Sequence, residues 1–159
     1  MRGPGSGFLV TERFAESFRA EGLTGLSGFQ PVEVVRVRGR RRGSNSTPIP
    51  RYVYVIPIFG GAAVDESRSL IRRSHPIACD ACRETGVDAI HGFSLEEGSW
   101  TGDDVFFARG MPGSAVVSER FARFVERHGL TNMLLIPTEE YTWDPLALGP
   151  PPTAPMRPA

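Results

Sequence analysis

The 159-residue chain contains no lysine, so its 18 Lys-or-Arg positions are all arginines. The 18 acidic residues balance them, and a formal net charge of zero disfavours a dedicated nucleic-acid binder. Only two cysteines are present, which is too few for a disulfide framework. The length is that of one ordinary domain, which buries a sizeable core without disulfides.

Long apolar runs and targeting signals are also missing. No stretch approaches the roughly 20 apolar residues that a membrane helix needs. Residues 8–10 are the only apolar run near the start, and they are too short for the hydrophobic region of a signal peptide. We therefore expect a cytoplasmic protein without a membrane partner. A reducing compartment in turn disfavours a structural disulfide between Cys79 and Cys82.

Recognisable catalytic motifs are scarce as well. The sequence has three histidines, and no nucleophilic triad, glycine-rich phosphate loop or HExxH motif is evident. We therefore expect no enzymatic activity and assign no catalytic residues.

What the chain does have is a block that occurs twice. Residues 9–15 (LVTERFA) are echoed by residues 116–122 (VVSERFA). Each copy is followed at the same spacing by Gly-Leu-Thr, at 22–24 and at 129–131. Equal spacing predicts that both copies share one local structure.

Each copy predicts a strand end, a short helix and a glycine stop. Thr11 and Ser118 are placed to cap a helix N-terminus, and phenylalanines follow at helical spacing. Beyond the glycines, residues 32–37 and residues 133–136 are rich in apolar residues and favour strands. The copies are either recognition elements or a duplicated packing unit, and apolar stripes of this kind favour packing.

The pattern after the first copy predicts a hairpin. Residues 31–38 and 51–59 are β-rich runs separated by a polar, glycine-containing turn. The second run is apolar on nearly every side, which predicts a central strand, and Pro57 predicts an interruption of its pairing. The turn gathers arginines that either grip phosphate or an acidic protein, or protect a sheet edge as solvated charges. These are Arg36, Arg38, Arg40, Arg41, Arg42 and Arg51.

The second chemical feature is a CxxC motif formed by Cys79 and Cys82. Two such thiolates chelate one zinc ion when two further ligands complete a tetrahedron, and His75 and His91 are the candidates within this chain. Buried thiols or a vestigial half-site are the alternatives, because one CxxC pair is a weak signal. A redox motif is disfavoured because no clear helix pattern follows the first cysteine.

The predicted fold class is α+β, with a mostly antiparallel sheet and two equivalent short helices from a repeated strand–helix–strand unit. We expect a flexible N-terminus over residues 1–7 and a single domain over residues 8–144. Residues 145–159 are proline-rich and predict a disordered tail.

Several of these features together resemble a known family. The CxxC motif, the segment 100–106 (WTGDDVF) and the Ser-Glu-Arg-Phe helix followed by Gly-Leu-Thr resemble the double-CxxCG-motif proteins of myxobacteria. The resemblance covers about residues 8–141. The chain departs from the family pattern because it has one CxxC and carries Arg83 in place of the following glycine. The resemblance therefore indicates a diverged or N-terminally truncated member, and leaves structural zinc open.

That family is associated with toxin immunity, so the resemblance implies a cytosolic immunity protein that binds a cognate toxin stoichiometrically. Acidic pairs flanked by aromatic anchors suit toxins with basic clefts. The aromatic residues that flank these acidic pairs are Trp100, Tyr141 and Trp143. The alternative is that Trp100 and Trp143 lie in the core or at its edge. The runner-up function is a small zinc-binding domain that contacts nucleic acid through the arginine turn. The candidate contact residues are Glu96, Glu97, Trp100, Asp103, Asp104, Glu139, Glu140 and Tyr141.

Overall fold

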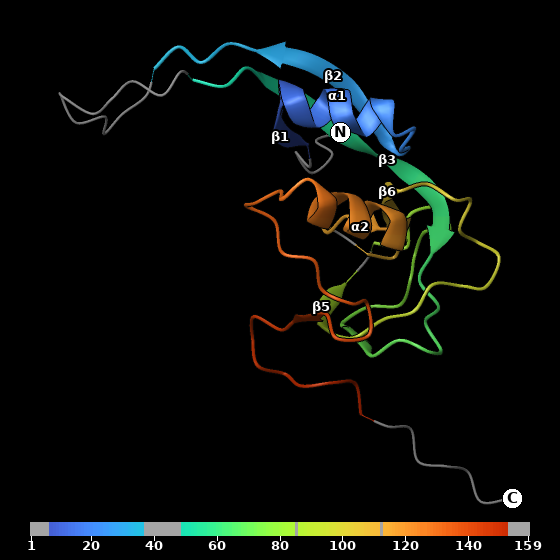
Figure 1. Cartoon of the computed structure of the whole chain (residues 1–159). Helices are drawn as coiled ribbons and strands as arrows, with labels where there is room; N and C mark the ends of the chain where they lie inside the picture. Colours follow the sequence, from blue (N-terminus) through green and yellow to red (C-terminus); the bar gives the residue numbers. More distant parts are fainter. Residues whose placement is uncertain (1–6, 37–48, 85, 112, 153–159) are drawn as a thin grey trace, which may run out of the picture.

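The structure is a computed structural model that describes residues 7–36, 49–84, 86–111 and 113–152. Within these ranges the chain forms two helices and eight strands, and Figure 1 shows their arrangement. In chain order they are β1 (Phe8–Thr11), α1 (Glu12–Ala20), β2 (Leu26–Val32), β3 (Tyr52–Ala63), β4 (Ile71–Arg73), β5 (Val87–His91), β6 (Val105–Arg109), β7 (Val116–Val117), α2 (Glu119–Arg127) and β8 (Thr142–Trp143).

The strands form two sheets. The larger sheet has the order β1-β3-β6-β7, with β2 also paired to β3. Its β3 and β6 run parallel, while its other pairs are antiparallel. The smaller sheet has the order β4-β5-β8 and is antiparallel. The predicted α+β class with two short helices and a mostly antiparallel sheet is confirmed.

Strand β3 is the centre of the larger sheet, as its apolar sequence predicts. Its first half pairs with β1 and β2 as far as Pro57, and from Ile58 onward it pairs with β6. The change of partner therefore falls at the proline, which has no N–H to give to a ladder. The partner strand β2 begins earlier than predicted and ends at Val32, so Val34 and Val35 lie outside it and are exposed.

Most of the predicted arginine turn lies outside the described residues. Arg38, Arg40, Arg41 and Arg42 belong to residues 37–48, and only Arg36 and Arg51 are described.

The two repeated blocks adopt the same local structure. Thr11 and Ser118 are the N-caps, and their hydroxyl oxygens accept from the backbone N–H three residues on, at 3.2 and 3.1 Å. Gly22 and Gly129 take left-handed conformations, with φ of +64° and +56°. The leucine after each glycine donates its N–H to a carbonyl five residues earlier and folds back onto the helix. Identical caps and stops therefore delimit both helices.

The apolar faces of the two helices pack against each other. Phe14 lies 6.3 Å from Phe121 and 5.7 Å from Phe124 between ring centroids, in edge-to-face geometry. Phe18 contacts the same two rings. All four rings are buried, together with Leu23 and Val105. The repeat therefore builds a shared core, as expected for a duplicated packing unit.

A buried carboxylate joins the two repeated units. Asp104, just before β6, accepts from the Thr24 N–H at 2.9 Å and from the Ser118 hydroxyl at 2.7 Å. Arg120 of α2 donates to the same carboxylate at 3.2 Å. Thr24 follows the glycine stop of the first unit, and Ser118 caps the helix of the second. One side chain thus fixes the end of one unit to the start of the other.

The start of the predicted disordered tail is held by hydrogen bonds. Asp144 accepts from the N–H groups of Leu148 and Gly149 at 2.9 and 2.8 Å, and Arg72 donates to the Leu148 carbonyl at 2.8 Å. The N–H of Leu148, followed by those of Gly149 and the His91 ring, lowers the pKa of Asp144 against the opposing effect of burial. Leu148 and Gly149 are thus hydrogen-bonded to the preceding domain, and residues 153–159 of the predicted tail lie outside the described ranges.

We predict that Asp104→Asn destabilises the fold by about 1–3 kcal/mol. The amide keeps one acceptor oxygen but turns a donor toward groups that already donate. Urea unfolding followed by circular dichroism measures the change. Asp103→Asn, at the half-exposed neighbouring position, is the matched control and should change stability by less than about 0.5 kcal/mol. Equal unfolding midpoints for the two variants would contradict this role of Asp104.

Candidate functional site

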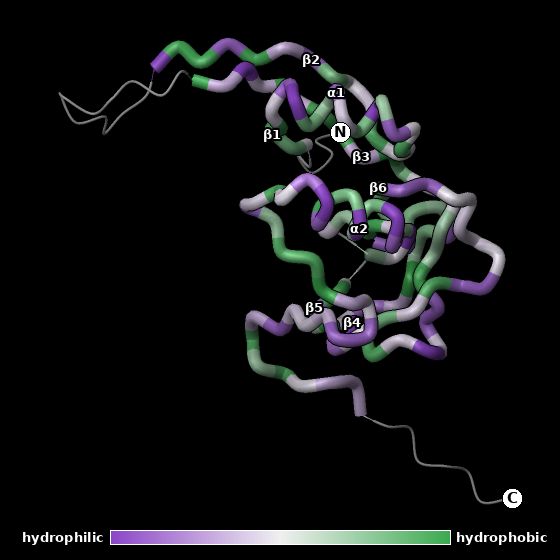
Figure 2. Tube along the Cα trace, in the orientation of Figure 1, coloured by the Kyte–Doolittle hydropathy of each residue, from purple (hydrophilic) through white to green (hydrophobic). Residues whose placement is uncertain are grey.

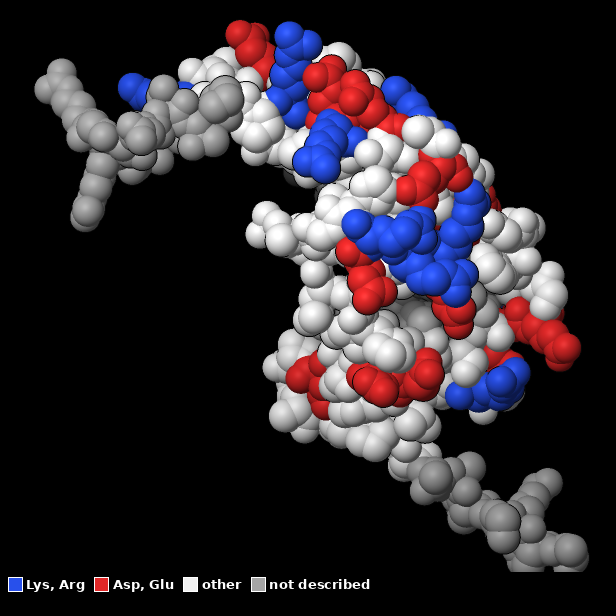
Figure 3. All heavy atoms as spheres, in the orientation of Figure 1, with Lys and Arg blue, Asp and Glu red and all other residues white. Residues whose placement is uncertain are grey.

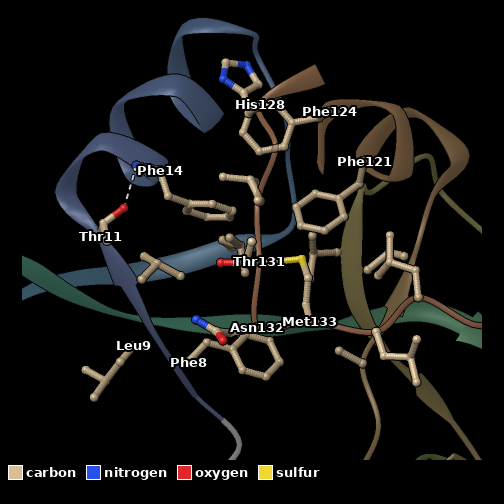
Figure 4. A pocket seen from close by; sticks show the side chains of 18 of the residues that line it. Phe8, Leu9, Thr11, Phe14, Phe121, Phe124, His128, Thr131, Asn132 and Met133 are labelled. Carbon is tan, nitrogen blue, oxygen red and sulfur yellow. Dashed lines mark hydrogen bonds between the residues drawn. The ribbon is translucent and has the colours of Figure 1, made fainter. Parts of the chain in front are cut away.

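A large cleft opens between the two repeated units. It measures about 1170 Å³ and lies between β1 with the start of α1 on one side and residues 128–136 on the other. Figure 4 shows it from close by, with Phe121 and Phe124 among the side chains that line it. The two helices pack together at one end of the cleft, so the phenylalanine core continues into its wall.

The rim of the cleft carries exposed apolar side chains. Leu134 is 81 % exposed and Leu9 is 62 % exposed. Both line the cleft, Leu9 from β1 and Leu134 from the segment that follows α2. Figure 2 shows the segment that follows α2 as a hydrophobic stretch along the margin of the molecule. The exposed apolar residues of the rim are Phe8, Leu9, Met133, Leu134 and Ile136.

The segment Met133 to Ile136 does not form the strand that the sequence predicts. The equivalent segment of the first unit leads into β2, which pairs with β3. Residues 133–136 belong to no strand and most of their side chains are exposed. The second unit is therefore strand then helix, without the second strand. The strand before the second helix, β7, pairs with β6, whose other edge is taken by β3, so the position equivalent to that of β2 in the first unit is already filled.

Two strands beside the cleft each have a free edge. Among the described residues, β1 pairs only with β3, and β7 pairs only with β6. Both line the cleft. An unpaired edge presents N–H and C=O groups that accept another extended segment. The cleft thus combines apolar side chains with free backbone hydrogen-bonding groups.

Polar groups at the end of the cleft tie the helix ends together. His128 places Nε2 2.6 Å from Glu21 Oε1, and Arg127 also donates to the Glu21 carboxylate. Glu21 and His128 are the C-caps of α1 and α2, so equivalent positions of the repeat contact each other. The hydrogen bond from His128, then that from Arg127, lowers the pKa of Glu21 against the opposing effect of burial. This ion-pair cluster holds the cleft wall.

A smaller hollow of about 500 Å³ adjoins the cleft on the other side of β7. Val116, Val117 and Thr138 line both. Trp100 stands at its rim, with its indole N–H donating to the Asp103 carbonyl at 2.9 Å. The hollow also contacts Arg120 and Arg123 of α2, so its charge is mixed rather than acidic.

The structure separates the predicted contact residues into exposed and internal groups. Glu97, Trp100, Glu139 and Glu140 are exposed. Glu96 and Asp103 are half-buried, and Glu96 forms an ion pair with Arg83.

Two further contact residues have internal partners. Tyr141 lines the cleft, packs edge-to-face on Phe93 and places its hydroxyl 2.8 Å from Ser114 Oγ. Asp104 is 2 % exposed and internally paired, so the prediction that it is a surface contact residue is corrected. Trp143 lies in β8 and is exposed rather than at the core.

The predicted zinc ligands do not come together. His91 places Nε2 3.1 Å from Asp144 Oδ2, and exposed His75 places Nδ1 3.0 Å from Ser74 Oγ. Within the part of the chain that the structure describes, no three His, Cys, Asp or Glu side chains are close enough to hold a metal ion. Cys79 and Cys82 remain as a pair on one turn. The residues present therefore do not fit a four-ligand zinc centre.

The two thiols of the CxxC turn lie in different environments, which the sequence did not indicate. Backbone N–H groups of Cys82, Ala81 and Arg83, together with the Cys82 thiol, favour the Cys79 thiolate and lower its pKa. Cys79 is exposed, whereas Cys82 is half-buried. Such backbone donors are what a helix N-terminus offers, and here a single turn supplies them.

Charge is distributed unevenly over the surface. Figure 3 shows basic and acidic side chains interspersed over the face that carries both helices. Along the margin formed by residues 133–136, no charged side chain occurs in the sequence. None of the helices in the described ranges is both long and apolar enough to span a membrane.

Comparison of the chain with family models, with curated proteins and with solved structures gave no match. The candidate site therefore rests on its own geometry. Sequence reasoning missed the apolar rim because residues 133–136 have the composition of a core strand.

We predict that Glu21→Gln reduces the loss of folding stability that occurs as the pH falls. Because folding lowers the pKa of Glu21 below its ordinary value of 4.5, its carboxylate stabilises the protein above that pH. That contribution is lost as the pH falls through the lowered pKa. Urea midpoints at about pH 7 and about pH 3.5 measure it. At the higher pH the urea midpoint of the wild type should exceed that of the variant, and at the lower pH the difference between the two midpoints should be smaller.

Glu16→Gln, at an exposed position of the same helix, is the matched control and should show no such gap. A difference between wild type and Glu21→Gln that is the same at both pH values would contradict the prediction.

Proposed function

We propose that this chain is a cytoplasmic immunity protein that neutralises a cognate bacterial toxin by stoichiometric binding. The cleft between the repeated units is the docking surface, and its occupant is an extended apolar segment of the toxin. The observation that carries the proposal is the apolar rim beside an unpaired strand edge. The resemblance to the double-CxxCG-motif proteins supplies the class of partner.

The size and chemistry of the cleft favour a polypeptide. Small-molecule sites measure about 300–1,000 Å³ and enclose their ligand. This cleft measures about 1170 Å³ and is bordered by leucines exposed to 81 and 62 %. Contiguous exposed apolar side chains mark interaction sites for proteins or membranes. The free edge of β1 adds backbone hydrogen bonds, which is how sheets recruit an extended peptide.

Acidic residues beside the cleft suit a basic toxin. Glu139 and Glu140 are exposed and directly follow Thr138, which lines both the cleft and the hollow. Glu97 and Trp100 are exposed on the loop that borders the hollow. Charges at the edge of an interface steer association and exclude wrong partners, while buried apolar contacts hold the complex. The proposed contact surface is thus an apolar cleft with exposed carboxylates at one side, next to a hollow of mixed charge.

No observation favours the runner-up function. Phosphate binding requires clustered cations, and most of the arginine turn lies outside the described residues. The zinc ligands that it needs are engaged elsewhere.

We predict that Leu134→Asp reduces protection against the toxin. The test co-expresses this chain in a susceptible host with the C-terminal domain of a candidate toxin encoded by an adjacent gene, and counts survivors. A carboxylate placed against an apolar segment should weaken binding of the purified toxin domain at least tenfold, equivalent to about 1.4 kcal/mol. Calorimetric titration measures that affinity.

Leu146→Asp is the matched control, because Leu146 is also strongly exposed, at 70 %, but lines neither the cleft nor the hollow. It should protect as well as the wild type. Equal loss in both variants would reject the cleft as the docking surface. Failure of the wild type to protect, or to bind the toxin domain, would reject the immunity function itself.

A further inference from the structure

The CxxC motif forms a closed turn at the surface, independent of the cleft. The Arg83 N–H donates to the Cys79 carbonyl at 2.8 Å, and Arg83 ends the turn with a φ of +54°. This hydrogen bond spans four residues and closes a single helical turn, in which Cα atoms three residues apart lie about 5 Å from each other. A disulfide needs a Cα separation of about 4.4–6.8 Å. The backbone therefore already holds the two cysteines at a spacing suited to a bond between them.

The two ends of this turn are held differently. The Cys82 carbonyl accepts from the Gly110 N–H at 2.8 Å, next to β6. Arg73 of β4 donates to the carbonyls of Arg83 and Gly110 at 3.2 and 3.1 Å. Cys82 is therefore anchored to the body of the protein and half-buried, whereas Cys79 is exposed. A reagent from solvent meets Cys79 first, with Cys82 held behind it.

The local chemistry matches that order. The backbone N–H and thiol of Cys82, followed by the N–H groups of Ala81 and Arg83, lower the pKa of the exposed Cys79 thiol against the opposing effect of burial. The thiolate is the attacking species in thiol–disulfide exchange. An exposed, activated first cysteine and a sheltered second cysteine are the parts that a two-step exchange requires.

We propose that Cys79 and Cys82 are a reversible thiol–disulfide site that reacts with glutathione disulfide or similar small disulfides. The Cys79 thiolate attacks one glutathione sulfur, and the first glutathione leaves as a thiolate. The Cys82 thiol then loses its proton to solvent, and the resulting thiolate attacks the Cys79 sulfur and expels the second glutathione as a thiolate. Two electrons pass from the cysteine pair to the glutathione disulfide, which becomes two thiols by taking up the two protons.

The experiment incubates the reduced full-length protein with glutathione disulfide and follows its mass. The wild type should lose the mass of two hydrogens and carry no adduct. Cys82→Ser should retain one glutathionyl group on Cys79, because nothing resolves it. In Cys79→Ser the remaining Cys82 thiol should form its glutathione adduct at least about tenfold more slowly than the Cys79 thiol does in Cys82→Ser, as expected of a thiol without an activating environment. Reduced glutathione in excess should restore the original mass.

The same variants in urea are the controls, because unfolding removes the turn and should make both single cysteines react at equal rates. Equal rates in the folded variants, or a wild type that accumulates a stable glutathione adduct, would overturn the proposal. Protection against the toxin by Cys79→Ser combined with Cys82→Ser is measured separately. That result bears on immunity and leaves the exchange chemistry unaffected.

Discussion

The carboxylate of Asp104 is the constraint on which the arrangement of the two repeated units depends. A charge with almost no access to water is stable only when donors surround it, and here the donors come from Thr24, Ser118 and Arg120. Ser118 also caps α2, so the same contact sets where that helix begins. The phenylalanines then fill the space between the helices. Electrostatic satisfaction fixes the geometry, and apolar packing supplies most of the stability.

The duplication is incomplete, and its asymmetry produces the candidate site. In the first unit, the segment after the helix turns into β2 and covers β3. In the second unit, β7 pairs with β6, whose other edge is taken by β3, and the equivalent segment belongs to no strand. Its apolar side chains therefore line the opening between the units. The repeated unit thus packs on β3 in its first copy and on β6 in its second, and only the first copy has an apolar exit that joins the sheet.

Local signals were sufficient to predict much of the fold. The caps at Thr11 and Ser118, the glycine stops and the central strand all depend on residues close in sequence. The fate of residues 133–136 depends on strand pairing between distant segments, which no local pattern records. The burial of Asp104 likewise depends on donors from Thr24 and Ser118, 80 and 14 residues away. An Asp-Asp pair in a polar loop resembles a surface patch until those donors are placed.

The sharing of β3 between the two units also determines how the chain folds. Its first half needs strands that precede it in sequence, and its second half needs β6, which follows much later. Closing that parallel pair requires a long loop to be ordered before the contact stabilises anything, which slows folding. Neither unit can complete its sheet without the other. The larger sheet should therefore form in one cooperative step, limited by the search of β6 for the exposed half of β3.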